Sequence, residues 1–271
     1  MLRLLVIFIA FQVAFAGNDE ELGPPSNRYF HIKPFIGFAE PVNSITHLVA
    51  AALVIVFCPF LYSRCKDKQA FFGVSLFVFG SVFSMSISGV YHLLTPYTTG
   101  RIVLRRIDHS AIYCFIAGTF SAIHATAFPH FLSRWLMVIF MWILAIIAIV
   151  FKSVFFSRIP AFFGYGLYLM MGWCGTISGY FLWKQHKRSR PIYLLIMGGL
   201  AYTIGAVLEF TTQKYMVIIP GVIHSHEVFH FFIMAGLYYH FVCVFYCLVH
   251  FHTNYHQIKD IALENDSLVG V

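Results

Sequence analysis

Seven long apolar stretches, separated by short polar segments, dominate the pattern of this sequence. Each is close to the ~20 residues that an α-helix needs to cross the hydrocarbon of a bilayer. The stretches cover residues 41–62, 71–94, 107–128, 134–152, 161–183, 191–212 and 224–249. Because a chain in lipid must satisfy its own backbone hydrogen bonds, we expect an all-α, polytopic membrane protein with a bundle of seven transmembrane helices.

The segment before the first stretch divides into two parts. Residues 1–16 contain Arg3, an apolar centre and the sequence Ala14-Phe15-Ala16, which is the layout of a secretory signal peptide. An uncleaved apolar arm packed on the bundle is the alternative. Residues 17–40 are expected to be polar and irregular, residues 41–250 to form one membrane domain, and residues 251–271 to form a polar tail.

The composition excludes a soluble globule. Of the 271 residues, 59% are hydrophobic and 11% are charged, which is too little polar surface to cover a soluble protein of this size. The formal charge of +7 lies between the apolar stretches, so it indicates contacts with lipid headgroups and no nucleic-acid partner. Lys and Arg are almost equally numerous on the two sides, and the side on which each end lies is therefore left open. The sequence specifies no oligomeric state.

Histidines inside the apolar stretches suggest a metal site. His226 and His230 are four residues apart, so on a helix both imidazoles can face one ion. His92 closes the second stretch, one turn after Ser88, and Asp108 opens the third. Because successive helices alternate in direction, all these residues are expected at the same membrane face. Three imidazoles, with a carboxylate on a water in the fourth position, match an open catalytic zinc site.

Each of these residues also has a simpler interpretation. The histidines could lie at the interface or donate hydrogen bonds to neighbouring helices. Asp108 could form a structural ion pair with Arg105 or Arg106. Glu227 follows the first histidine of the pair, but one residue rotates it about 100° around a helix. Asp108 therefore ranks above Glu227 as the carboxylate that orients the water.

A further polar group begins the first stretch. Glu40, Asn43 and His47 are spaced three and four residues apart, so they share one face at the same membrane side as the zinc candidates. They could form a second shell around the metal, together with Glu227. A helix cap with interhelical hydrogen bonds is the alternative. Three other intramembrane histidines are interpreted as packing or hydrogen-bonding residues: His109, His124 and His240.

Five motifs, in order along residues 40–250, resemble the hemolysin III branch of the progestin and adipoQ receptor (PAQR) family. They are Glu40-Pro41-Val42-Asn43-Ser44-Ile45-Thr46-His47, Ser88-Gly89-Val90-Tyr91-His92, Asp108-His109-Ser110, Gly198-Gly199-Leu200-Ala201-Tyr202-Thr203-Ile204-Gly205-Ala206 and His226-Glu227-Val228-Phe229-His230. The resemblance implies a seven-helix bundle within the wider ceramidase-like superfamily of membrane hydrolases.

The same resemblance implies zinc held by His92, His226 and His230, with Asp108 on the water and Ser88 nearby. The adiponectin receptor branch and the similar alkaline ceramidases imply hydrolysis of a lipid amide such as ceramide. Typical members lack a signal peptide, which places their zinc end at the cytosol. The signal-like start of this chain would place it on the other side.

Three functions are therefore compared. The first is a zinc-dependent intramembrane hydrolase of a lipid amide or ester, in which Asp108 accepts a proton from water and Ser88 or the metal supports the oxyanion. The second is a non-enzymatic receptor, sensor or membrane-homeostasis protein with structural zinc. The third is a pore-forming haemolysin, which ranks last because no helix carries a continuous polar stripe. Membrane lipids are the expected partners in all three.

Overall fold

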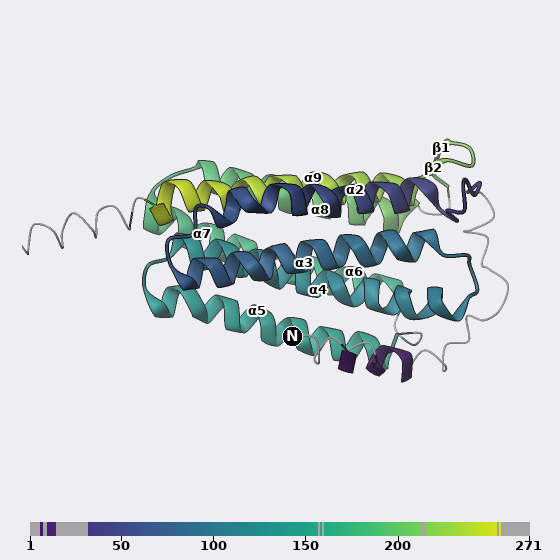
Figure 1. The fold of residues 1–271 in the computed structure, drawn as a ribbon, viewed down its shortest axis with the longest axis horizontal. Coiled ribbons are helices and arrows are strands. Elements are labelled where there is room, and N and C mark those ends of the chain that lie inside the picture. Colours follow the sequence, from purple (N-terminus) through teal and green to yellow (C-terminus); the bar gives the residue numbers. More distant parts are fainter. Residues whose placement is uncertain are drawn as a thin grey trace, which may run out of the picture.

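Long antiparallel helices account for almost all of the described chain (Figure 1). The computed structural model describes residues 6–7, 10–14, 32–156, 158, 160–212, 215–253 and 255. The helices are α2 (Pro41–Tyr62), α3 (Lys68–Leu93), α4 (Thr99–Ala127), α5 (Phe131–Val154), α6 (Ala161–Trp173), α7 (Gly175–His186), α8 (Arg190–Thr212) and α9 (Ser225–Cys247), which continues into the π-helical turn η1 (Leu248–His252). The expectation of an all-α, multi-pass membrane protein is confirmed.

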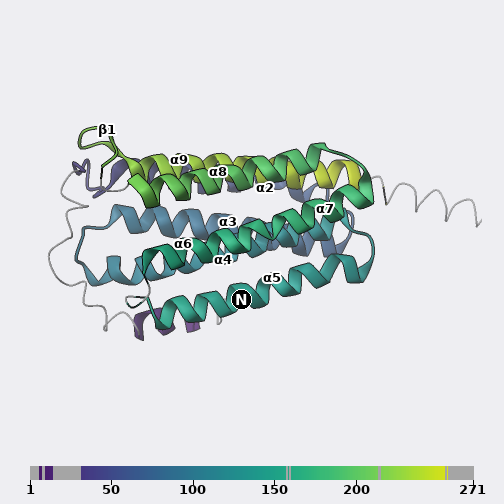
Figure 2. The ribbon, with the colours of Figure 1, turned by 180° about the vertical axis from the view of Figure 1, so that it is seen from behind.

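Within the described part of the chain, six segments are long and apolar enough to cross a membrane, and the last of them, Ser225–His252, joins α9 to η1. The expected helix over residues 161–183 is instead divided into α6 and α7, which run end to end in Figures 1 and 2. At the junction, the backbone N–H of Cys174 donates to the carbonyl of Met171, 3.2 Å away and three residues back. This tightened turn lies between Gly172 and Gly175, and glycine weakens a helix interior. The fifth expected stretch is therefore occupied by two helices, of 13 and 12 residues, each too short to cross a membrane alone.

The start of α4 corrects one expectation. The third helix was expected to begin at residue 107, but it begins at Thr99, where the Thr98 hydroxyl accepts the backbone N–H of Arg101. Arg101 and Arg106 lie inside this helix with exposed fractions of 4% and 2%. Arginine lowers the hydropathy of a sequence segment, and for that reason the predicted helix began too late. In the structure these arginines bond to protein groups, such as the Ser153 carbonyl 2.7 Å from Arg106. Asp108 consequently lies more than two turns inside α4 and does not open it.

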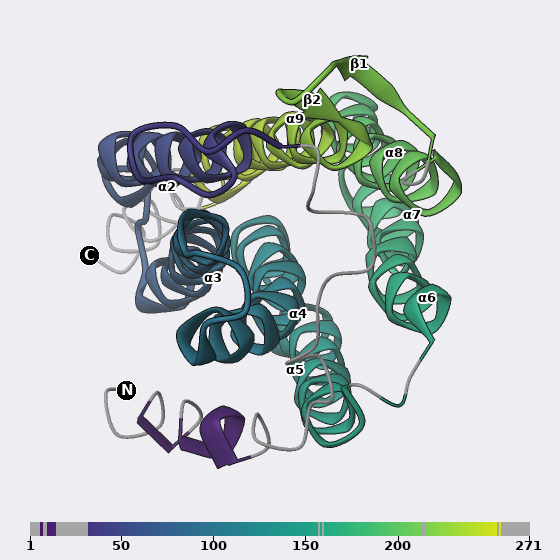
Figure 3. The ribbon, with the colours of Figure 1, turned by 90° about the vertical axis from the view of Figure 1, so that its right-hand side faces the viewer.

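The helices form three groups around the bundle axis. Along the bundle axis, α2, α9 and α8 form one row, α3, α4 and α5 form a second, and α6 with α7 stands on a third side (Figure 3). One hydrophobic cluster joins α2, α3, α4, α7, α8, α9 and η1, and a second joins α4, α5 and α6. At one end of the bundle, a hairpin of β1 (Val217–Ile219) and β2 (Ile223–His224) connects α8 to α9. The carboxyl ends of α3 and α8 and the amino ends of α2, α4 and α9 gather at this same end (Figure 1).

Part of the amino-terminal segment packs on the bundle. The described residues 6–7 and 10–14 are helical, and the buried Gln12 side chain donates to the hydroxyls of Ser153, at 2.5 Å, and Ser110, at 3.3 Å. The predicted cleavage position after Ala16, most of the polar segment 17–40 and most of the tail 251–271 lie outside the described residues. The signal peptide therefore stays a prediction.

The contact between α3 and α4 depends on small residues, as is common where membrane helices approach closely. A Cβ atom at Gly118 would lie 2.6 Å from the carbonyl oxygen of Leu76. Gly118→Ala is therefore expected to force the two helices apart and to destabilise the fold by about 1–3 kcal/mol. Thermal unfolding in detergent measures this. The control is Gly166→Ala on α6, where a Cβ meets nothing within 4 Å; equal melting temperatures of the two variants would contradict the packing described.

Candidate metal centre

Three histidines converge at the end of the bundle where α3 finishes and α9 begins. One candidate ligand nitrogen from each of His92, His226 and His230 lies within 4.8 Å of the other two. The Nε2 atoms of His92 and His226 are 3.4 Å apart. Tetrahedral zinc with Zn–N bonds of about 2.0–2.1 Å places neighbouring nitrogens about 3.4 Å apart. In addition, the buried Nδ1 of His230 has no hydrogen-bond partner among the described residues. The donor set therefore fits a zinc ion.

Carboxylates lie behind two of these imidazoles. The Nδ1 atom of His92 is 2.6 Å from Glu40 Oε2, and the Nδ1 atom of His226 is 3.2 Å from Glu209 Oε1. A carboxylate on the far nitrogen fixes the tautomer and turns the other nitrogen towards a metal. Both rings are thus held with Nε2 directed at the shared space between them.

Glu209 is a site residue that the sequence analysis missed. It lies in α8 with an exposed fraction of 2%. The signal was present, because Glu209 is the one acidic residue in the apolar stretch 191–212, and a carboxylate inside a membrane span is a functional candidate by default. It was missed because no metal-ligand spacing relates it to the histidines.

Glu40 is held in place from three helices. The Arg101 guanidinium of α4 forms an ion pair with Glu40, and the Asn43 amide of α2 donates to it at 3.1 Å. Burial would raise the pKa of Glu40, but the adjacent His92 and Arg101 outweigh it and hold that pKa well below its ordinary value. Glu40 is therefore an ionised acceptor for the His92 ring. Arg101, which sequence analysis placed in a loop, is the second residue that it missed.

Glu227 forms its hydrogen bonds with the backbone of His224 and with Asn43. Its carboxylate accepts the backbone N–H of His224 at 2.8 Å and the Asn43 amide at 2.7 Å. These contacts fix the start of α9 and tie it to α2. Both carboxylate oxygens are used in this way, so Glu227 has a structural role at the helix terminus.

Asp108 and Ser88 form a pair beside the histidines. The Ser88 hydroxyl and the Asp108 carboxyl lie close enough to influence each other, and Asp108 lies within electrostatic range of His226. Both residues line the same cavity as the three histidines. His47 stacks on His230 with 3.8 Å between ring centroids, and neither of its ring nitrogens has a partner among the described residues. His47 therefore supports the His230 ring by packing.

The other intramembrane histidines have partners elsewhere. His109 Nδ1 lies 3.1 Å from the Tyr168 hydroxyl, His124 Nε2 lies 2.9 Å from the Ser178 hydroxyl, and His240 Nε2 lies 3.3 Å from the Leu195 carbonyl. Each contact joins two helices, and none of these histidines belongs to the three-histidine group.

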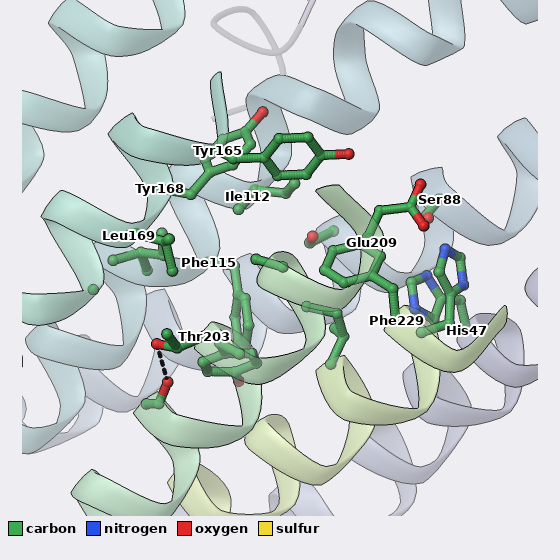
Figure 4. A pocket seen from close by; sticks show the side chains of 18 of the residues that line it. His47, Ser88, Ile112, Phe115, Tyr165, Tyr168, Leu169, Thr203, Glu209 and Phe229 are labelled. Atoms are coloured by element: carbon green, nitrogen blue, oxygen red, sulfur yellow. Dashed lines mark hydrogen bonds between the residues drawn. The ribbon is translucent and has the colours of Figure 1, made fainter. Parts of the chain in front are cut away.

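A cavity of about 1630 Å³ extends from the histidines into the bundle. It exceeds the range of about 300–1,000 Å³ typical of small-molecule sites. In Figure 4, His47, Ser88 and Glu209 lie at one end of it, and Tyr165, Tyr168 and Leu169 lie across from them. Its walls further along are mainly apolar and come from α4, α6, α7, α8 and α9: Ile112, Phe115, Ile116, Phe120, Ile123, Leu169, Trp173, Trp183, Ile192, Leu195, Ile196, Leu200 and Ile233. The cavity thus joins a polar end to a long apolar space.

The contact between Glu209 and His226 predicts that loss of the Glu209 charge weakens zinc binding without abolishing it. Glu209→Gln removes the charge next to His226 Nδ1, and loss of such a partner lowers metal affinity about 10–100-fold. The matched isosteric change Asp67→Asn, at the residue that caps α3 at the opposite end of the bundle, should leave zinc affinity close to that of the unaltered protein. Competition with a chromogenic chelator measures both. Equal losses in the two variants would contradict the assignment of Glu209 to the site.

Comparison with known proteins agrees with the fold. The family described as "Haemolysin-III related" matches residues 35–241. The hemolysin-3 homolog of Bacillus subtilis (strain 168) is 32% identical over 218 residues, which cover 77% of this chain and 94% of the relative. Hemolysin-3 of Bacillus cereus is 29% identical over 218 residues, which cover 77% of this chain and 92% of the relative. All three histidines lie inside the matched region. The chain therefore belongs to the haemolysin-III-related family of integral, multi-pass membrane proteins.

Proposed function

We propose that this protein is a zinc-dependent intramembrane hydrolase of a lipid amide or ester. One observation carries the proposal: the three-histidine group and the Asp108–Ser88 pair lie together at the polar end of a long, mainly apolar cavity. A hydrolase of lipids needs this combination, because the scissile group is polar and the acyl chain is not.

Three histidine ligands would leave one coordination position of a zinc ion open for water or substrate. With three protein ligands, a zinc ion would keep a fourth position open, polarise a carbonyl group and lower the pKa of a water to about 7. Asp108 is the residue placed to accept a proton from the attacking water, since its carboxyl faces the cavity next to the histidines. The Ser88 hydroxyl lies beside Asp108 and could donate to that carboxyl when the site is occupied. A contact between Ser88 and the oxyanion stays a prediction.

The cavity supports a lipid as the substrate. The His226 side chain is 37% exposed, so a substrate carbonyl can reach it. Beyond it, Phe115, Leu169 and Ile196 are among the apolar side chains that line the space. Burial of an acyl chain against such walls gains about 0.8 kcal/mol per CH₂ group. An N-acyl lipid such as ceramide, or an acyl ester, is the substrate class that fits.

A second function is favoured by a different observation. The histidines come from α3 and α9, and the carboxylates behind them come from the start of α2 and from α8. Bound zinc would therefore tie several helices together, as in a receptor, a sensor or a membrane-homeostasis protein with structural metal. A pore-forming haemolysin is less well supported, because the polar lining is concentrated at one end of the cavity and most of the remaining walls are apolar.

Replacement of Asp108 separates the hydrolase from the structural role. Asp108→Asn should lower turnover by about 10²–10⁴-fold, since it removes the proton acceptor, while zinc content and melting temperature are retained. Release of fatty acid from ceramide and from acyl esters in mixed micelles measures turnover.

The control for this variant is Asp67→Asn. Asp67 caps α3 at the opposite end of the bundle, where its carboxylate accepts the backbone N–H of Ala70, and asparagine serves equally well as a cap. Asp67→Asn should keep full turnover. Loss of zinc or of the fold in Asp108→Asn would favour the structural role of the metal instead.

A further inference from the structure

Three basic side chains gather around one aromatic ring beside the cavity. Lys152 Nζ lies 4.8 Å from the centroid of the Phe156 ring, and the guanidinium carbons of Arg105 and Arg106 lie 5.3 Å and 5.0 Å from it. Lys152, Arg105 and Phe156 line the cavity. The group combines the last turns of α5 with the second turn of α4, at the same end of the bundle as the histidines.

Lys152 is the informative member of this group. It lies in the last turn of α5, from which a lysine side chain ordinarily reaches the aqueous interface. Its exposed fraction is nevertheless 5%. The side chain is directed towards α6, where a Cβ atom at Gly164 would lie 3.4 Å from Nζ. The absence of a side chain at Gly164 leaves the space that the ammonium group approaches.

The electrostatic surroundings of Lys152 are unfavourable as they stand. The charged side chains acting on it are Arg105 and Arg106, and no carboxylate pairs with its Nζ among the described residues. A buried cation that faces other cations is costly, and the cost is relieved when an anion enters the space between them. Phosphate suits this position because both guanidinium and ammonium groups bind it strongly.

We propose that Arg105 and Lys152 form a binding site for the phosphate headgroup of a lipid whose chain extends along the cavity. A basic cluster that only touches the membrane surface would have exposed side chains, whereas Lys152 is buried and faces the interior. Arg105 lies one turn before Asp108 on α4, so a bound phosphate would lie beside the histidine end of the cavity. The ester or amide carbonyl of a phospholipid is only a few bonds from its phosphate. The inference goes beyond the proposed hydrolysis, because it concerns binding and requires neither metal nor turnover.

The test compares two amphiphiles that differ by one phosphate. The probes are 1-O-oleyl glycerol 3-phosphate and 1-O-oleyl glycerol, whose ether bond resists hydrolysis, and glycerol 3-phosphate, which lacks the chain. Binding to the detergent-purified full chain is followed by the fluorescence of Trp173 and Trp183, which line the cavity, and by thermal stabilisation. The phosphate amphiphile is expected to bind about tenfold or more tightly than the neutral one. Glycerol 3-phosphate is expected to bind far more weakly than either.

Substitutions of Lys152 and Arg105 test whether these two residues cause the preference for the phosphate amphiphile. Lys152→Gln and, separately, Arg105→Gln should reduce the preference for the phosphate amphiphile about tenfold, while Lys152→Arg should keep it. The control is Lys68→Gln at the exposed start of α3, which should change nothing. An undiminished preference in both folded glutamine variants would overturn the site. Equal binding of glycerol 3-phosphate and of the phosphate amphiphile would overturn its assignment to a lipid.

Discussion

The buried contact between Glu40 and His92 is the interaction on which this end of the bundle depends. Hydrocarbon offers no partner to a charged or polar side chain, so each such group must find one within the protein. Glu40 meets this requirement with His92 of α3, Arg101 of α4 and Asn43 of α2, and Asn43 in turn bonds to Glu227 at the start of α9. Four helices are thereby fixed relative to one another. The positions of the three histidines follow from this network.

The division between polar and apolar regions explains why the candidate site lies at one end of the bundle. Charged and imidazole groups are concentrated where helix ends supply backbone groups and capping partners. Beyond them, α6 and α7 line the cavity, and glycines along this side take up little space, including Gly172, where a Cβ would meet nothing within 4 Å. The result is a cavity with histidine and carboxylate side chains at one end and mainly apolar walls elsewhere. Such a cavity suits a molecule that is itself polar at one end and apolar along its length.

Much of this arrangement could be predicted from the sequence. The apolar stretches gave the number and position of most crossings, and the spacing of His226 and His230 placed two imidazoles on one helix face. The alternation of helix direction predicted which residues share a membrane face, but individual hydrogen-bond partners across helices could not be predicted, because periodicity along a chain does not say which helices are neighbours. Glu209 was overlooked for that reason, and Arg101 was assigned to a loop because its partner, Glu40, lies on another helix. The division at Cys174 was also missed, since glycines such as Gly172 and Gly175 are common in membrane helices and do not by themselves predict a break.

Metal content tests the central claim of this account most directly. Elemental analysis of detergent-purified protein, prepared without chelator, should give about one zinc per chain, and the double variant His226→Ala/His230→Ala should lose it. The exposed pair His130→Ala/His250→Ala, at the opposite end of the bundle, should keep it. Absence of zinc from the unaltered protein, or its retention when His226 and His230 are replaced, would contradict the account.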